Sequence, residues 1–430
     1  MGKASLWYKA CIGLVIGSVA FAVRAAPDRA TPNLAAADRG GPSDTSWKRL
    51  FDQLKSLGDR MLPLIERPDD RQLRAELDQL MLGVLMHGYL DLVVSDPDQP
   101  MLMPGYGLAM NYAAPNGDTL YYHSRIDGAG VYRLSGTRGT VPIVNIGVGD
   151  QWYQMLGKLT PRKDFNLDSL TIDGSGHFSV IMSAERPSGY TGDWWQIPAT
   201  SNNLGVRQVS NDWAREMDTQ LSIERIDRPV NIPRRTAADL QRQIADLPTW
   251  VEHGTASFLE HVKAVRARPA NSLHVFDPSG GGGLPGQSYY DGLFRIAADE
   301  ALILDAVPPP GCKYWSVLLT DELFATVDWM NHQSSINGAQ ARLDADGHSR
   351  AVIALSDPGV ANWLDPGGHF QGFIQGRWLG CKADGQPTLT KVPLADLRQH
   401  LPADTAFITP AERDESLRQR KRAFQARRWW

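Results

Sequence analysis

An amide and a carboxylate stand two residues apart at Asn116 and Asp118, directly after Pro115 and before the strand-like run from Thr119 to Tyr122. Asparagine and aspartate at this spacing can turn the chain, because their side chains hydrogen-bond to the backbone two residues on. At the mouth of a strand the same two groups can instead hold a polar ligand, and Asp118 could then act as a general base. The residues leave both interpretations open.

Four arginines lie in runs with strand-like alternation, where burial would require each guanidinium to have an acidic partner or an anionic group of a ligand. They are Arg125, Arg207, Arg295 and Arg377, and the internal acids considered as partners are Asp127, Asp150 and Asp321. The chain also has 13 Trp and 12 Tyr, whose wide apolar surfaces suit aromatic, terpenoid or sterol-like compounds and sugar rings. Most of these aromatic side chains are expected to belong to the core of a β-rich protein.

The common local signatures of hydrolase, nucleotide and metal sites are missing from the sequence. There is no Gly-x-Ser-x-Gly and no His-Glu-x-x-His. The glycine-rich run 281–288 imitates a phosphate-binding loop, but Gln287 stands where lysine is essential. His253 and His261 are about 12 Å apart along an expected helix, too far to share one ion. We therefore predict no metal and no cofactor, and the formal charge of −4 gives no reason to expect nucleic acid.

The N-terminus has the pattern of a secretory signal peptide. Lys3 and Lys9 precede an apolar or small stretch from residue 10 to residue 23, and small-residue cleavage contexts follow near Ala22 to Ala26. As a helix this stretch would span about 21 Å, short of a bilayer core of roughly 30 Å. We expect export to the periplasm or beyond. There Cys312 and Cys381 could form a disulfide, and two buried free thiols are the alternative.

Apolar periodicity indicates helices on either side of a first β-rich stretch. Leucine and methionine recur every three or four residues from about 46 to 94, and a second helical stretch runs from about 236 to 268. The second stretch opens with a capping-box pattern from Thr236 to Asp239. Between and after the helices, short runs of Val, Ile, Tyr and Trp alternate with turns that contain glycine.

The two β-rich stretches are expected to be copies of one another, because short matches recur at a nearly constant offset. Residues 173–177 match 344–348 at an offset of 171, and Arg207 matches Arg377 at an offset of 170. The sequence therefore predicts a mainly β fold with helical additions (α+β). In it, two duplicated antiparallel β-sandwich or jelly-roll-like modules are joined by a helical linker.

The run from Asn116 to Tyr121 resembles the Asn-x-Asp-Thr-Leu-Tyr signature of the bacterial families catalogued as domains of unknown function 1254 and 1214. Segments that contain Asn331, Asn362 and Trp363 are similar to the C-terminal type of that family, and the resemblance spans about 100 to 392. It implies a β-sandwich with helical additions and no established activity. The second copy has Gly-Gln-Ser-Tyr at 286–289 where the first has Asn-Gly-Asp-Thr, which favours one site in the first copy.

These patterns divide the chain into seven parts. They are a signal peptide at 1–25, a disordered tether at 26–44, a helical region at 45–100, a first β module at 101–230, a helical linker at 231–270, a second β module at 271–395 and a basic tail at 396–430. The tail is interpreted as a frayed, solvated helix, with weak contact to an anionic membrane surface as the alternative.

The expected function is the binding of a small amphiphilic or aromatic organic molecule in a cleft of the first β module. The alternatives are a cofactor-independent catabolic hydrolase or lyase with Asp118 as base, and a structural protein that contacts the cell envelope. The expected ligand-binding residues are Asn116, Tyr121, Arg125, Trp152, Arg207, Arg295, Asn331, Asn362, Trp363 and Arg377.

Overall fold

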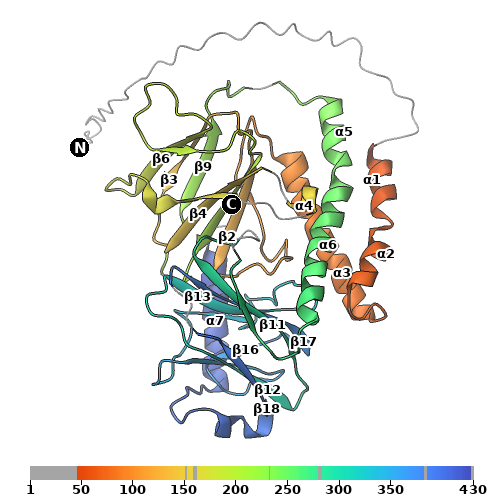
Figure 1. Ribbon diagram of the computed structural model, residues 1–430, viewed down its shortest axis with the longest axis vertical. Coiled ribbons are helices and arrows are strands. Elements are labelled where there is room, and N and C mark those ends of the chain that lie inside the picture. The colour runs from red at the N-terminus through yellow and green to blue at the C-terminus, as the bar shows by residue number, and fades with distance from the viewer. Residues whose placement is uncertain are drawn as a thin grey trace, which may run out of the picture. The chain divides into compact units, whose positions relative to one another are not determined.

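Two sandwiches of β-strands and a group of helices make up the described part of the chain (Figure 1). The structure is a computed structural model, and it describes residues 46–150, 153–157, 162–231, 233–278, 283–381 and 385–427. The expected signal peptide and tether, and Trp152, lie outside the described residues. The described residues all belong to one compact unit.

The first module consists of two sheets packed face to face. Its strands are β1 (Met103–Pro104), β2 (Thr119–Arg125), β3 (Tyr132–Thr137), β4 (Ile143–Gly149), β5 (Arg162–Asn166), β6 (His177–Ser183), β7 (Trp194–Gln196), β8 (Asn203–Val209) and β9 (Gln220–Arg225). One sheet, here called sheet A, has the order β1-β2-β8-β4-β5, and the other has the order β7-β6-β3-β9. All neighbours are antiparallel except β6 and β7. Buried apolar side chains of both sheets, such as Val144, Val206, Leu134 and Val180, form the core between them.

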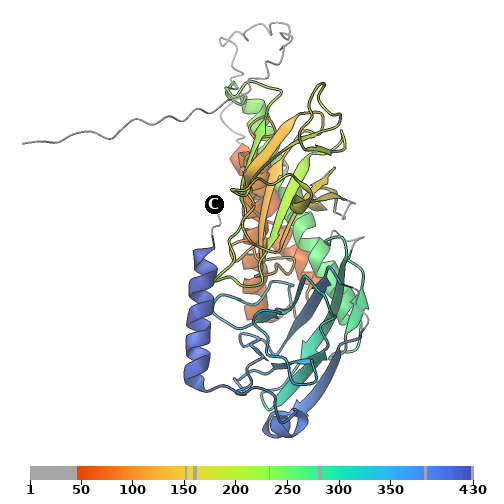
Figure 2. The same ribbon diagram turned by 90° about the vertical axis from the view of Figure 1, so that its left-hand side faces the viewer.

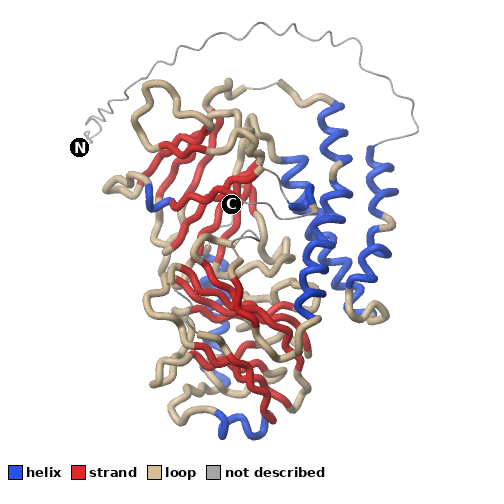
Figure 3. The backbone as a smooth tube through the Cα atoms, viewed as in Figure 1, coloured by secondary structure: helices blue, strands red, loops and turns tan. Residues whose placement is uncertain are grey.

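The second module repeats this arrangement strand for strand. Figure 3 shows the strands of the chain in two groups, one above the other. Its strands are β10 (His274–Phe276), β11 (Gln287–Arg295), β12 (Glu300–Ala306), β13 (Tyr314–Thr320), β14 (Ser335–Asn337), β15 (Ser349–Ile353), β16 (Trp363–Leu364), β17 (Gln371–Leu379) and β18 (Thr388–Pro393). Its sheets have the orders β10-β11-β17-β13-β14 and β16-β15-β12-β18, and β15 with β16 is again the parallel pair. Matching turns before β6 and β15 place Gly176 and Gly347 at φ of +84° and +82°, where a side chain would be strained. The predicted fold class, including the duplication, is confirmed.

The helices form a third group, and their apolar faces pack on one another. They are α1 (Ser46–Leu54), α2 (Leu57–Met61), α3 (Arg71–Gly88), a π-helix η2 (Tyr89–Val94), α4 (Tyr153–Leu156), α5 (Ala237–Ala245) and α6 (Leu247–Arg266). The side chain of Asp70 accepts hydrogen bonds from the first turn of α3, and Thr236 with Asp239 forms the expected capping box of α5. Leu77 and Val84 of α3 share a buried cluster with Trp250 of α6. Within the described residues, the stretch Arg71–Val94 is the one helix long and apolar enough to cross a membrane, and 44% of its apolar window is buried inside the protein.

The C-terminal helix α7 (Pro410–Ala426) is docked on the protein, so the prediction of a frayed, solvated tail was wrong (Figure 2). Thr409 and Glu412 form a capping box that satisfies the first turn. Near the other end, Phe424 is 2% exposed and packs against Trp213 of the first module and Trp329 of the second. Burial of this aromatic anchor explains why the helix stays on the surface of the modules despite its charge.

A disulfide joins Cys312, just before β13, to Cys381, just after β17. The pairing expected from the sequence is confirmed, and the alternative of two free thiols is wrong. The bond closes a sequence separation of 69 residues within the second module.

Candidate functional site

The two faces of sheet A differ in chemistry. One face packs against the second sheet of the first module, and the other carries polar side chains and glycines because side chains alternate along each strand. Strand by strand, this polar face presents Tyr121 and His123, Gly205 and Arg207, Asn145 and Gly147, and Arg162 and Asp164.

Two glycines that pair directly across β4 and β8 make room for an arginine on the polar face. A Cβ atom at Gly147 would lie 2.9 Å from Nε of Arg162, and a Cβ atom at Gly205 would lie 2.9 Å from its Nη2. The guanidinium of Arg162 therefore lies against both glycines, and its Nη2 donates a hydrogen bond to the carbonyl of Gly147. Any larger residue at either glycine would displace this arginine.

A cavity of about 50 Å³ lies at this polar face, and we call it the polar cavity. Its charged lining consists of Arg162, Arg207 and Asp164, and His87 and His123 contribute two imidazole rings. Its volume is enough for a few water molecules or for one small polar group of a ligand.

Burial dominates the electrostatics of the polar cavity. Burial, reinforced by the neighbouring Arg207, lowers the pKa of Arg162 to about 10, whereas Asp164 acts in the opposite direction. Burial also raises the pKa of Asp164, against the influence of Arg207 and Arg162. Two guanidinium groups and one carboxyl group therefore line the polar cavity, and burial disfavours the charged form of Arg162 and of Asp164.

A second cavity, of about 60 Å³, adjoins the polar cavity, and we call it the apolar cavity. The residues that line both are Gly105, Tyr106, Tyr121 and Tyr122. Further walls of the apolar cavity are Met86, Met110, Leu120, Trp329 and Phe424. The second module and α7 thus supply two aromatic side chains to a cavity that is otherwise built by the first module and the helices.

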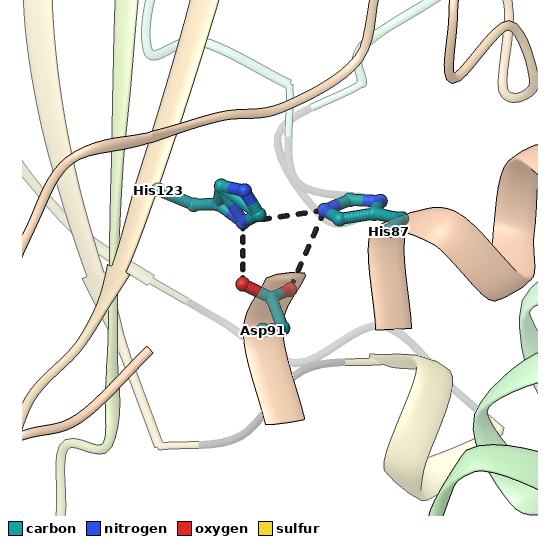
Figure 4. Close-up of side chains that lie close together, drawn as sticks. All are labelled: His87, Asp91 and His123. Atoms are coloured by element: carbon teal, nitrogen blue, oxygen red, sulfur yellow. Dashed lines mark hydrogen bonds and ion pairs between the residues drawn. The ribbon is translucent and has the colours of Figure 1, made fainter. Parts of the chain in front are cut away.

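His87 and His123, in the lining of the polar cavity, converge on a buried carboxylate, Asp91 (Figure 4). His87 lies in the last turn of α3, Asp91 follows four residues later in the π-helix, and His123 projects from β2. Nδ1 of His123 lies 2.5 Å from Oδ1 of Asp91, and Nε2 of His87 lies 3.4 Å from Oδ2. The two nitrogens are 3.2 Å apart. We call these residues the His-Asp-His cluster, and π-helical turns of this kind are frequent at functional sites.

Contacts on the outer side of each ring orient the cluster. Nε2 of His123 lies 2.7 Å from the carbonyl oxygen of Pro104, and Nδ1 of His87 lies 2.5 Å from the hydroxyl of Tyr112. Because a carbonyl only accepts, Nε2 of His123 carries a proton, and in the neutral ring Nδ1 presents a lone pair toward Asp91. Burial lowers the pKa of His87 to about 3, although Asp91 acts to raise it, so this ring is neutral at physiological pH.

The structure brings two of the predicted ligand-binding residues to the cavities. Tyr121 and Arg207 pair directly across β2 and β8, and both line the polar cavity. Arg377 occupies the position in the second module that Arg207 has in the first. Its guanidinium lies over the ring of Tyr289, and its Nη2 donates to Oε1 of Gln375 at 2.5 Å.

Five other predicted residues line neither cavity. They are Arg125, Arg295, Asn331, Asn362 and Trp363. Arg295 pairs with Glu66 at 3.2 Å, and Asn331 bonds to Asp328 at 2.6 Å in an exposed turn. Asn362 is hydrogen-bonded to the backbone of Arg342. Trp363 is buried, its ring lies against the guanidinium of Arg413 of α7, and its Nε1 donates to the backbone carbonyl of Ala354. Two acids expected to pair with these arginines have other partners. Asp127 pairs with Arg225, and Asp321 accepts from the backbone N–H groups of Leu323 and Ala325.

Asp118 and Asn116 are buried at the junction between the modules and line neither cavity. The carboxylate of Asp118 accepts hydrogen bonds from Trp213 at 2.8 Å, Asn337 at 2.8 Å and Tyr314 at 2.5 Å. Asn116 accepts from the backbone N–H of Asp118, as in the expected turn, and its amide donates to Tyr314 at 2.6 Å. Protein donors thus surround the carboxylate. The role of Asp118 as an accessible base is corrected to that of a structural link between modules.

Sequence reasoning missed most of the site, namely His87, Asp91, Arg162 and Asp164, and it missed His123 although the signature ends two residues before it. Two signals were present. His87 and Asp91 have the spacing of one helix face, and Gly147 and Gly205 interrupt strand-like runs, which marks a close approach of another group.

The second module does not repeat the polar cavity. When Arg207 is matched with Arg377, Gly205 corresponds to Gln375. Gly205 pairs across the sheet with His123 and Gly147, and Gln375 pairs in the same way with Asp291 and Leu318. A bulky residue fills the place of each glycine, so the site belongs to the first copy alone.

Comparisons with known proteins give relatives but no activity. No protein-family model matches the sequence, and no curated protein matches it. Among solved structures, an uncharacterized protein from Burkholderia cenocepacia is 30% identical with a TM-score of 0.76, and the match covers 81% of this chain and 97% of that chain. A protein from Vibrio parahaemolyticus is 13% identical with a TM-score of 0.44, over 74% of this chain and 98% of that chain.

Proposed function

This chain belongs to the same family as the Burkholderia cenocepacia protein, and from that premise we propose that it binds a small amphiphilic or aromatic organic acid in the first β module. The acid group would occupy the polar cavity and the apolar body would occupy the adjoining apolar cavity. The observation that carries the proposal is the pairing of Arg162 and Arg207 in a cavity with one acidic wall, Asp164.

The polar cavity suits an anion for two reasons. Its lining includes two guanidinium groups, which bind carboxylates through paired, charge-assisted hydrogen bonds. The glycines at 147 and 205 hold space open above the sheet for Arg162, and this space is missing from the second module. A purely structural ion pair would need neither feature.

The apolar cavity defines the other end of the ligand. Trp329 and Phe424 form walls from outside the first module, and Tyr106 and Tyr121 separate the apolar residues from the arginines. Pockets for small molecules combine a largely apolar lining with a few placed polar groups, and the two adjoining cavities have this composition.

Export to the periplasm is part of the proposal, and it rests on the signal-peptide pattern of residues 1–25. We also infer that the family is the one catalogued as domains of unknown function 1254 and 1214, because of the Asn-x-Asp-Thr-Leu-Tyr signature at 116–121.

Calorimetric titration with defined carboxylates tests the proposal. The probes are benzoate and hexanoate, with benzamide and hexanamide as uncharged counterparts. The variant Arg207→Gln removes one guanidinium of the polar cavity on β8, and Arg125→Gln is the matched control on the neighbouring strand β2 and outside both cavities.

We expect the wild type to bind the two carboxylates and not the two amides. The variant Arg207→Gln should bind the carboxylates roughly 10- to 100-fold more weakly, because it has lost a charged hydrogen bond. Arg125→Gln should bind as the wild type does. Equal affinities for Arg207→Gln and Arg125→Gln, or no carboxylate binding by the wild type, would contradict the proposal.

A further inference from the structure

The geometry points to a divalent transition-metal site formed by Nε2 of His87, Nδ1 of His123 and the carboxylate of Asp91, with its open coordination positions toward the polar cavity. This inference goes beyond ligand binding and stands on separate observations. It assigns a role to three buried polar side chains that the anion site does not use.

The spacing of the three donors fits one ion. Ligands about 2.1 Å from a metal lie about 3.0 Å apart in octahedral and about 3.4 Å apart in tetrahedral coordination. The distances in the cluster are 3.2 Å between the two nitrogens and 3.4 Å from His87 to Asp91, and the third, from His123 to Asp91, is 2.5 Å. An outward movement of His123 by about half an ångström would complete the set.

The arrangement of His123 and Asp91 calls for a cation between them. Nε2 of His123 faces the carbonyl of Pro104 at 2.7 Å, which leaves Nδ1 directed at Oδ1 of Asp91 at 2.5 Å and at Nε2 of His87 at 3.2 Å. Asp91 is 0% exposed, and neither of its oxygens has a partner with the alignment of a hydrogen bond. Burial of a carboxylate is costly unless its charge and its lone pairs are satisfied, and a metal ion bound by all three side chains would satisfy both.

The outer contacts have the form found around metal ligands. The ring of His123 donates to a backbone carbonyl and the ring of His87 contacts the hydroxyl of Tyr112, which itself accepts from Gln154 at 3.1 Å. Such partners fix the ring orientation and the tautomer of metal-binding histidines. All three ligands also project from regular elements, α3, η2 and β2, which hold them in place.

The donor set indicates the class of metal and the kind of site. Two imidazoles and one carboxylate suit Zn²⁺, Fe²⁺, Mn²⁺ or Co²⁺ and not Ca²⁺ or Mg²⁺, which take mainly oxygen ligands. Three protein ligands leave at least one position open, as in catalytic and not in structural sites. Because His87 and His123 line the polar cavity, an ion here could bind an oxygen of the molecule held by Arg162 and Arg207.

Metal titration of the tag-free, full-length protein after treatment with a chelator tests the inference. Co²⁺ is added and followed by its visible absorption, and Zn²⁺ binding is measured by competition with a chromophoric chelator. The variants Asp91→Asn and His123→Gln each remove one ligand, and His274→Gln replaces a histidine whose side chain is 58% exposed as the matched control.

We expect one Co²⁺ or Zn²⁺ per chain in the wild type and in His274→Gln, and binding at least roughly 100-fold weaker in both ligand variants, since even outer contacts are worth 10- to 100-fold. If a variant fails to fold, X-ray absorption of the wild-type cobalt complex must still show nitrogen and oxygen neighbours with two imidazoles. Binding that is absent in the wild type, or unchanged in folded Asp91→Asn and His123→Gln, would overturn the inference.

The metal titration tests the metal site independently of the proposed anion site. Arg207→Gln should bind Co²⁺ with unchanged stoichiometry, because it is not a ligand. Benzoate binding by metal-free wild type together with absence of metal binding would overturn the metal site alone, and the reverse result would overturn the anion site alone.

Discussion

Replacement of Asp118 by alanine should destabilise the protein strongly without directly affecting the ligand site. The side chain of Asp118 is buried, and its carboxylate accepts from Trp213 of the first module and from Tyr314 and Asn337 of the second. Alanine would leave Nε1 of Trp213 and the hydroxyl of Tyr314 without this acceptor at the junction of the modules, and Nδ2 of Asn337 would keep only its bond to the carbonyl of Asn211. Each such donor costs about 1–3 kcal/mol, and removal of one member of a buried charged network costs about 3–5 kcal/mol, which we take as the expected loss.

Differential scanning calorimetry and urea unfolding of the full chain measure this loss, which corresponds to roughly 3–6 °C in Tm for a chain of this size. Asp118→Asn, which keeps one oxygen but turns its amide toward a donor, should lie between alanine and wild type. At temperatures where Asp118→Ala stays folded, benzoate affinity should change less than threefold. If Asp118→Ala keeps the wild-type Tm but loses benzoate binding, this reasoning is refuted and Asp118 belongs to the ligand site.

Three further predictions concern other parts of the structure. Replacing both Cys312 and Cys381 by serine should lower the free energy of unfolding by on the order of 4 kcal/mol, measured by urea unfolding, because the loop between them is long; an unchanged midpoint would contradict this. Burial raises the pKa of Asp321 to about 7 from 3.8. Between these two values the folded state holds a proton that the unfolded state has released, so the contribution of Asp321 to the free energy of unfolding falls as pH rises from about 4 to about 7. Asp321→Asn should therefore be more stable than the wild type at pH 8 by a few kcal/mol and similar to it at pH 4, and equal effects at both pH values would refute the assignment. Gly205→Ala should weaken benzoate binding by displacing Arg162, and calorimetry that shows an unchanged affinity would contradict the proposed role of this glycine.

The fold class and the duplication were predictable because they leave regular traces in the sequence. Equal offsets between matching turns reflect equal strand orders, and the periodic leucines of 46–94 mark helices whose apolar faces pack together. The docking of α7 was also encoded, since Thr409 and Glu412 form a capping box. The basic residues of the tail favour a solvated helix, but burial of Phe424 offsets their preference for solvent.

The sequence favours one site in the first copy, and most of the residues that line the polar cavity differ from the residues expected there. Asn116 and Asp118 distinguish the copies because they link the modules, and their donors Tyr314 and Asn337 lie about 200 residues further along the chain, where no local pattern shows the contact. The His-Asp-His cluster joins a helix to a strand 36 residues away, and neither segment contains a metal-binding motif by itself. Convergence of this kind is a property of the tertiary structure.

Mass spectrometry of small molecules extracted from the protein, purified from its native compartment without denaturation, tests the central claim most directly. The wild type, Arg207→Gln and Arg125→Gln are compared in parallel. The account predicts an organic acid with an apolar body that is enriched in the wild type and in Arg125→Gln and depleted in folded Arg207→Gln. Absence of any acid enriched in the wild type over Arg207→Gln would contradict it.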